Sequence, residues 1–172
     1  MGVFESLVSA INDTAAQPGV IGRLKTWGRV AGLDEKTADI EAQFLADPSL
    51  PGLIIREGRE IFGILSRRAL LSTISQPYGR EVFIKRPLRE MAARMDTAPL
   101  MLPATTTVPA ALKFSLTRAD ELRFEPVLVH SAEGVTLLEM HVLMIAQANM
   151  LEETLSSRDR LLEKIRGVVG GR

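Results

Sequence analysis

The side chains best suited to do chemistry in this sequence are basic and lie close together. Segment 56–94 holds nine Lys and Arg against four Asp and Glu, whereas the whole 172-residue chain has 21 of each kind and no net charge. A helix that begins at Ser66 would add free backbone N–H groups and the positive end of its dipole, which together favour an anion. These features indicate a site for a phosphate-bearing ligand. Its candidate residues are Ser66, Arg67, Arg68, Arg80 and Arg86.

A second interpretation of the same arginines needs no ligand. An acidic stretch precedes the basic one and contains Asp34, Glu35, Asp39, Glu41 and Asp47. The arginines could form ion pairs with these carboxylates in the folded chain, or they could form a solvated basic face. The sequence leaves both interpretations open.

The sequence offers few residues for catalysis or metal binding. Without cysteine, the chain has no disulfide, no thiolate nucleophile and no Cys-ligated metal. Its two histidines, His130 and His141, belong to different predicted elements and lack a carboxylate pair at ligand spacing. No Ser-His-Asp set, phosphate loop or Gly-x-Gly-x-x-Gly motif is present. We therefore expect a protein that is not an enzyme and holds no metal or cofactor.

Net charge and hydropathy limit the kinds of partner and the cellular location that we expect for this chain. A neutral chain lacks the surplus of cations that non-specific binding to nucleic acid or membrane surfaces requires. The apolar runs are far shorter than the roughly 20 residues that cross a bilayer. Residues 1–14 lack the basic start of a signal peptide. The expected location is the cytoplasm, with no nucleic-acid or membrane partner.

The elements that must position these residues form two similar units. In the first, a helix capped by Thr37 ends at Asp47-Pro48, strands follow at 53–55 and 61–65, and a helix covers 69–74. In the second, a helix over 108–116 precedes strands at 127–129 and 135–138, and a long helix starts near Met140. An offset of about 74 residues relates the two units. The pattern predicts an α+β fold with a pseudo-symmetric tandem.

The expected organisation has four parts. They are an N-terminal helical arm at 1–36, a first copy with its connector at 37–95, a second copy at 96–142 and a C-terminal helix at 143–172. The arm begins with apolar residues at helical spacing over 3–11. Trp27 is expected to anchor the arm by packing, and Tyr78 to pack at the connector.

Apolar residues near the C-terminus recur with a period of 3.5 residues. We define the seam as Met144, Ala148, Leu151, Leu155, Leu162 and Ile165, with Arg158 filling its one break. This period keeps one side of a helix against a partner helix. A helix from Met140 to Arg166 would be about 40 Å long, which one small domain cannot cover. The seam therefore predicts a parallel coiled coil in a homodimer, and Gly167, Gly170 and Gly171 are expected to end the helix.

Three segments together resemble a known family over residues 37–156. The segment from Phe44 to Arg68, Phe-Leu-Ala-Asp-Pro-Ser-Leu-Pro-Gly-Leu-Ile-Ile-Arg-Glu-Gly-Arg-Glu-Ile-Phe-Gly-Ile-Leu-Ser-Arg-Arg, resembles the first half of a cystathionine-β-synthase (CBS) domain. Pro-Tyr-Gly-Arg at 77–80 and Lys-Arg-Pro-Leu at 85–88 resemble the connector of a bacterial subgroup of CBS pairs. Leu-Leu-Glu-Met-His at 137–141, with Ala-Gln at 146–147, resembles the end of the second copy there.

This resemblance implies a tandem CBS pair, or Bateman module, that is regulatory. In the subgroup the pair often precedes a histidine kinase or a diguanylate cyclase, and many CBS pairs bind adenine nucleotides between the copies. Ligand-binding copies usually carry Gly-x-x-Thr/Ser-x-x-Asp at the start of the last helix. Here Gly63 and Ser66 match, but Ala69 replaces the aspartate, and a methyl group cannot accept bonds from a ribose diol. The second copy lacks both the glycine and the hydroxyl.

Two functional hypotheses follow from these observations. In the first, the pair senses an anionic or nucleotide-type ligand and relays its state through the C-terminal coiled coil to a signalling output domain, in cis or in trans. In the second, the chain is a structural dimerisation or adaptor domain with a degenerate, empty cleft. Binding of a nucleotide distinguishes them.

Overall fold

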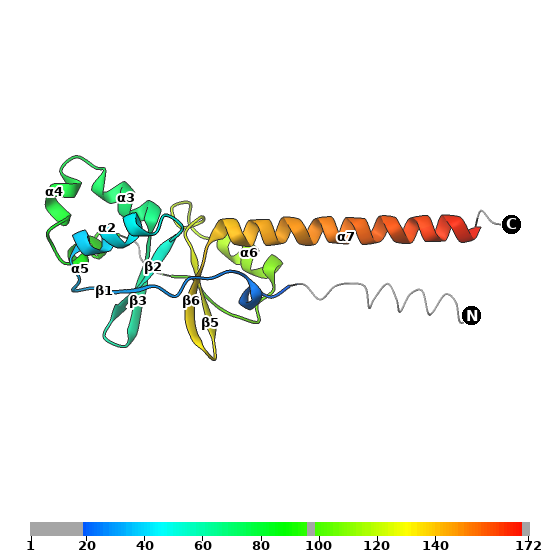
Figure 1. Ribbon diagram of the computed structural model, residues 1–172, viewed down its shortest axis with the longest axis horizontal. Coiled ribbons are helices and arrows are strands. Elements are labelled where there is room, and N and C mark those ends of the chain that lie inside the picture. The colour runs from blue at the N-terminus through cyan, green and yellow to red at the C-terminus, as the bar shows by residue number, and fades with distance from the viewer. Residues whose placement is uncertain (1–18, 96–98, 170–172) are drawn as a thin grey trace.

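The computed structural model describes residues 19–95 and 99–169, and it is built from two similar units (Figure 1). The first contains β1 (Val30–Gly32), α2 (Thr37–Ala46), β2 (Gly52–Glu57), β3 (Glu60–Ser66) and α3 (Arg67–Ile74). The second contains β4 (Met101–Pro103), α6 (Val108–Leu116), β5 (Val127–Ser131), β6 (Gly134–Leu138) and α7 (Met140–Val169). A short helix η1 (Ile21–Arg23) precedes them, and α4 (Gly79–Phe83) and α5 (Leu88–Ala92) lie between them. We call the two units copy 1 and copy 2.

The predicted α+β tandem is confirmed, with one strand added to each copy. The sheets have the orders β1-β2-β3 and β4-β5-β6, and the first strand of each is parallel to the second. Leu53 pairs with Leu65 in copy 1, and Val127 pairs with Leu138 in copy 2, so the 74-residue offset holds at β2 and β5. The repeat begins at β1 and β4, three-residue strands that are too short for an alternating pattern to reveal.

Each copy is completed by a segment that lies just before the other copy in the sequence: η1 packs on copy 2, and α5 packs on copy 1. In copy 2 the backbone N–H of Ile21 donates to Thr106 (2.9 Å), and in copy 1 that of Leu88 donates to Glu35 (2.8 Å). The side chains of Ile21 and Leu88 are both buried. Over the described residues the chain therefore runs from copy 2 to copy 1 and back, and a segment outside each copy supplies part of that copy's core.

Trp27 lies where the chain crosses. Its backbone N–H donates to Leu137 of β6 (2.9 Å), and it accepts in return from the N–H of Leu137 (2.7 Å). Its ring packs on the core of copy 1, and the Lys25 ammonium lies 4.9 Å from the ring centroid. The predicted packing role of Trp27 is confirmed.

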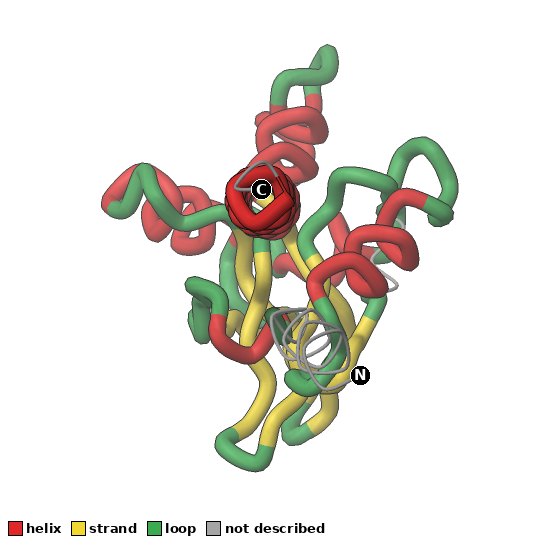
Figure 2. Tube along the Cα trace, turned by 90° about the vertical axis from the view of Figure 1, so that its right-hand side faces the viewer, coloured by secondary structure: helices red, strands yellow, loops and turns green. Residues whose placement is uncertain are grey.

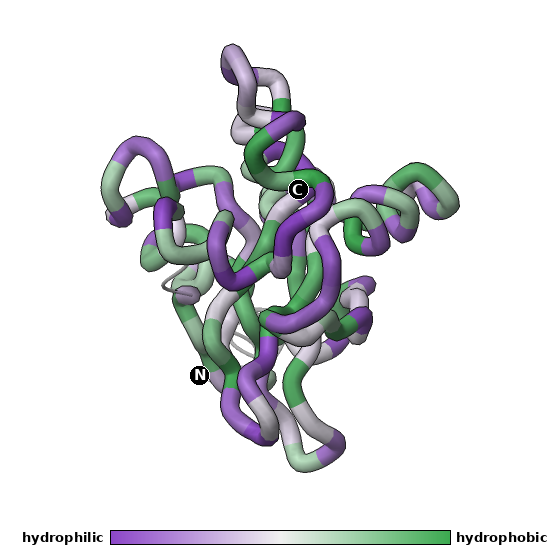
Figure 3. Tube along the Cα trace, turned by 90° about the vertical axis from the view of Figure 1, so that its left-hand side faces the viewer, coloured by the Kyte–Doolittle hydropathy of each residue, from purple (hydrophilic) through white to green (hydrophobic). Residues whose placement is uncertain are grey.

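The two sheets meet through a small apolar cluster. Ile54, Ile64, Leu128 and Leu137 are buried together, and they come from β2, β3, β5 and β6. The two hairpins lie side by side with their turns pointing the same way, while the helices gather at the other end of the strands (Figures 1 and 2). The strands are largely hydrophobic near the helices, and hydrophilic residues occur at the hairpin turns (Figure 3).

Three local predictions were wrong. Thr37 does not cap α2: it is the first helical residue, and its hydroxyl donates to the carbonyl of Arg86 (3.1 Å). Tyr78 does not pack at the connector, because it is 76% exposed with a left-handed backbone (φ 62°). Gly167 does not end the last helix, which continues to Val169. The predicted helix over 3–11 and the end signals Gly170 and Gly171 lie outside the described residues.

The last helix begins in the globular part and extends beyond it. Met140 and Leu143, in its first turn, are buried in the core of copy 2. From there α7 projects away from both sheets (Figure 1). Its 30 residues give a length of about 45 Å at 1.5 Å per residue. No helix among the described residues has the length and apolar character to span a membrane.

Candidate functional site

The start of α3 carries three of the five candidate ligand residues, and its polar groups are already engaged. Ser66 is the N-cap, only 3% exposed, and its Oγ accepts from the backbone N–H of Ala69 (3.0 Å). The backbone N–H of Arg67 donates to the carbonyl of Pro51 (2.8 Å). A helix start normally offers these N–H groups to an anion. Here two of them bind groups of the protein instead.

The side chain of Arg67 fastens the end of α2. Its guanidinium donates to the carbonyls of Phe44 (2.8 Å), Asp47 (2.5 Å) and Leu50 (3.1 Å). It also lies over the Phe44 ring, 5.1 Å from the centroid. The Phe44 carbonyl belongs to the last turn of α2, which leaves it without a partner within the helix, whereas the carbonyls of Asp47 and Leu50 lie in the loop that follows. Arg67 therefore stabilises the α2–β2 loop.

Arg68 joins the two copies. Its Nε and Nη2 both donate to Oε1 of Glu125 (3.1 and 2.5 Å), and Nη2 also donates to the carbonyl of Glu121 (2.8 Å). Both glutamates belong to the loop between α6 and β5 in copy 2. We call this set of contacts the clasp.

Arg80 and Arg86 bind carboxylates away from the start of α3. Arg80 holds both oxygens of Glu41 on α2 (2.5 and 3.0 Å), and this hydrogen-bonded carboxylate raises the pKa of Arg80. Arg86 pairs with Glu90 (2.6 Å) four residues on. The ion pair of Arg80 with Glu41 is one that the ligand-free interpretation anticipated. All four candidate arginines thus have protein partners, on different elements, and their binding of a ligand stays a prediction.

A hollow of about 350 Å³ lies at one end of the sheet of copy 1. Its lining comprises Gly32, Leu33, Asp34, Glu35, Arg56, Glu57, Gly58 and Arg89. Arg89 spans it by donating to Glu57 (2.6 Å) and Asp34 (3.1 Å), and these hydrogen bonds, that to Glu57 foremost, raise the pKa of Arg89. Arg89 therefore ties the β1–α2 loop to the end of β2.

Arg118 is a structural residue of copy 2 that the sequence analysis did not single out. Its guanidinium donates to the carbonyls of Ser115 (3.3 Å) and Glu125 (2.5 Å), and so spans the loop from the end of α6 to the start of β5. Burial lowers the pKa of Arg118, and the nearby charge of Glu125 opposes that shift. No periodic pattern or motif marks a loop arginine of this kind.

The strand pairing fixes the register of the motif in copy 2. Because Ile64 pairs with Ile54 and Leu137 with Leu128, Ser66 corresponds to Glu139. Glu139 carries no hydroxyl, and its carboxylate lies 2.8 Å from Nδ1 of His141. No group of three metal-ligating side chains occurs in the described parts of the chain.

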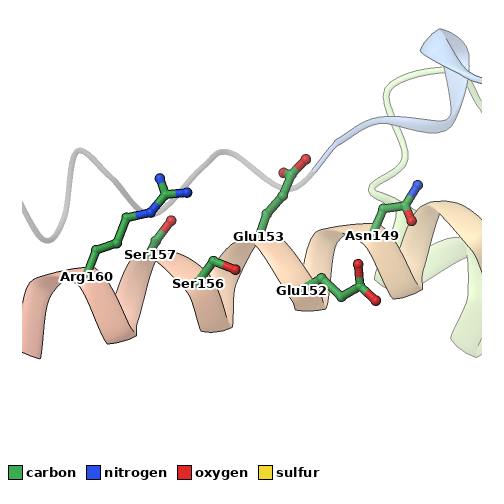
Figure 4. A pocket seen from close by; sticks show the side chains of 6 residues that line it. All are labelled: Asn149, Glu152, Glu153, Ser156, Ser157 and Arg160. Atoms are coloured by element: carbon green, nitrogen blue, oxygen red, sulfur yellow. The ribbon is translucent and has the colours of Figure 1, made fainter.

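The seam residues stand exposed on α7. Met144, Leu151, Leu155, Leu162 and Ile165 are 42–55% exposed, and Ala148 is also exposed. Another side of the helix carries Asn149, Glu152, Glu153, Ser156, Ser157 and Arg160 (Figure 4). All six belong to α7, so they form a polar face of this helix. The helix thus presents distinct apolar and polar sides.

Comparison with solved structures identifies the fold. No family model and no curated protein matches the sequence. Among solved structures, a CBS-domain protein from Agrobacterium tumefaciens matches with a TM-score of 0.59 at 13% identity, over 77% of this chain and 96% of that one. CBSX2, solved in complex with AMP, matches at 0.54 and 18%, over 76% and 97%. A CBS-domain protein from Thermotoga maritima matches at 0.54 and 18%, over 74% and 89%. The fold is that of a tandem CBS-domain pair.

Proposed function

We propose that this chain is a non-catalytic regulatory module that pairs with a second copy of itself through α7 and relays the state of its CBS-type copies to a signalling output domain. The exposed seam is the observation that carries the proposal. Its large apolar side chains repeat with the period of a coiled coil on a helix that leaves the globular part. Such a row gains stability when an identical row covers it.

The joint between α7 and copy 2 suits a relay. Met140 and Leu143 are buried in the copy 2 core, and α7 continues from them without a break through the seam. A change in the packing of the two copies would therefore alter the position or crossing of two paired α7 helices. A ligand drives such a change only as far as its affinities for the two packings differ.

The proposed input is a nucleotide or another phosphate-bearing ligand bound between the copies. CBSX2, which has this fold, was solved with AMP. Among the candidates Ser66, Arg67, Arg68, Arg80 and Arg86, we favour Arg68, since it contacts both copies and its side chain is 62% exposed. The output partner in this proposal is a histidine kinase or diguanylate cyclase domain, in cis or in trans, as in the bacterial subgroup that the connector resembles.

A second candidate function is a dimerisation or adaptor domain that binds no ligand. It is favoured by Ala69 at the motif's acidic position and by the protein partners of the candidate arginines. Thermal unfolding with adenine nucleotides separates the two functions. A ligand at a hundredfold excess over its Kd adds about 2.7 kcal/mol to the stability of the folded state, and an adaptor shows no shift.

Pairing through α7 is tested by introducing one cysteine, because the chain has none of its own. In a parallel, in-register pair, Leu162→Cys places two thiols across the seam, and mild oxidation should give a covalent dimer. The matched control is Glu163→Cys, one residue away and outside the seam, which should stay monomeric on denaturing gels. Equal cross-linking of both variants would refute parallel pairing through the seam.

A further inference from the structure

The clasp is an anion-binding contact between side chains that differ in exposure. The Arg68 side chain is 62% exposed, whereas that of Glu125 is 16% exposed. Solutes therefore reach the guanidinium from solvent, while the carboxylate is largely covered. A guanidinium binds phosphate oxygens with the same N–H groups that bind a carboxylate. Arg68 thus presents a phosphate-competent group whose Nε and Nη2 donors already bind an internal carboxylate.

The glutamates of the clasp come from a loop that is longer in copy 2. Residues 117–126 separate α6 from β5, whereas residues 47–51 separate α2 from β2. The additional length brings Glu121 and Glu125 to Arg68 of the other copy. The equivalent loop of copy 1 is shorter, and Arg67 of the same copy binds its carbonyl groups.

The loop has a second anchor that does not depend on Arg68. Arg118 binds the carbonyls of Ser115 and Glu125 from within copy 2. If Arg68 releases Glu125, these bonds still hold the loop to the end of α6. Opening of the clasp therefore breaks a link between the copies without unfolding the loop.

We infer that Glu125 is an internal competitor for the ligand: a phosphate-bearing ligand between the copies displaces the Glu125 carboxylate from Arg68 and so releases one side-chain link between copy 1 and copy 2. This inference rests on the ligand input of the proposed function. It needs no free N–H at the start of α3, where the backbone N–H groups of Arg67 and Ala69 are engaged. The ligand and the carboxylate simply exchange on one guanidinium.

Competition between Glu125 and the ligand lowers the apparent affinity for the ligand. A ligand that binds only the open form loses apparent affinity in proportion to the fraction of molecules that are open. For a partly exposed arginine–carboxylate contact, we expect removal of the competitor to raise the affinity about three- to tenfold.

The test measures the binding of AMP and of inorganic pyrophosphate by titration calorimetry at low salt. Glu125→Gln should bind at least one probe about three- to tenfold more tightly than the parent chain. Glu121→Gln is the matched control, because it removes the same charge from the same loop while Arg68 contacts only the backbone carbonyl of Glu121. This control should bind as the parent does. Arg68→Gln should abolish binding, alone and combined with Glu125→Gln.

Three results would overturn the inference. They are a gain in Glu125→Gln no larger than in Glu121→Gln, an Arg68→Gln variant that binds as the parent does, and the absence of binding in every variant. The last result would leave pairing through α7 standing, because the cysteine experiment reports that pairing without a ligand. Thermal unfolding of each variant checks that the chain remains folded.

Discussion

Replacing Leu155 and Leu162 by glutamate should separate the proposed pair of α7 helices while leaving each chain folded. In the single chain these side chains are 51% and 47% exposed, so pairing has about half of each left to bury. Full burial of a leucine is worth roughly 1.5–3 kcal/mol, which gives about 1 kcal/mol for each half. Four such leucines in a pair contribute about 4 kcal/mol, or nearly a thousandfold in Kd. Carboxylates facing one another across the seam weaken the pair further.

Analytical ultracentrifugation over a series of micromolar concentrations measures this loss. The matched control is the double variant Asn149→Glu/Ser156→Glu, which adds two charges at the same seven-residue spacing on the polar face of α7. It should sediment as the parent does, and both variants should keep the parent's thermal unfolding at low concentration. A parent chain that is monomeric throughout would refute the pairing, and so would a Leu155→Glu/Leu162→Glu variant as dimeric as the parent.

Two further changes test the fold. Gly79→Ala should destabilise the chain by about 1–3 kcal/mol, because its Cβ would clash with the carbonyl oxygen of Thr73. The control Gly28→Ala, with no atom within 4 Å of the added Cβ, should stay near the parent in urea unfolding. The Ser49 hydroxyl, by hydrogen bonding to Asp47, lowers the pKa of that carboxyl in the folded chain. This contribution is present above the unfolded pKa and lost as the pH falls through the folded pKa. Ser49→Ala should therefore reduce the loss of stability on acidification, and an unchanged acid unfolding profile would contradict this.

The helices and strands that could be predicted from the sequence are those with an apolar pattern within their own residues. The helix α6 begins at Val108 and ends at Leu116, as its apolar spacing indicated. The strands β2 and β3 include the predicted apolar segments 53–55 and 61–65 and are slightly longer. The strands β1 and β4 could not be predicted in this way. Each has three residues, and what makes it a strand is pairing with β2 or β5, which lies more than twenty residues away. A local pattern contains no information about such a partner.

The candidate site likewise has features that could be predicted from the sequence and features that could not. Ser66 could be predicted to start a helix from its residue type and position, and it is the N-cap of α3. The partners of the arginines could not be predicted, because Arg67 binds backbone carbonyls, which every residue has. Arg68 and Glu125 are 57 positions apart in the chain, in different copies. The number of basic residues in segment 56–94 could be read from the sequence, whereas the partner of each arginine depends on the three-dimensional fold.

The two copies fasten the same loop with arginines at non-equivalent positions, and this difference bears on how α7 is attached. Arg67, the first residue of α3, binds the carbonyl of Phe44 near the end of α2, and Arg118 binds that of Ser115 at the matching place in α6. The strand pairing aligns Arg67 with Met140, the first residue of α7. Since the longer loop of copy 2 supplies its own arginine, that first position is free to hold a methionine, which is 3% exposed in the core. The helix α7 is therefore anchored by apolar packing, which salt does not screen, and a change in the packing of copy 2 acts directly on its first turn.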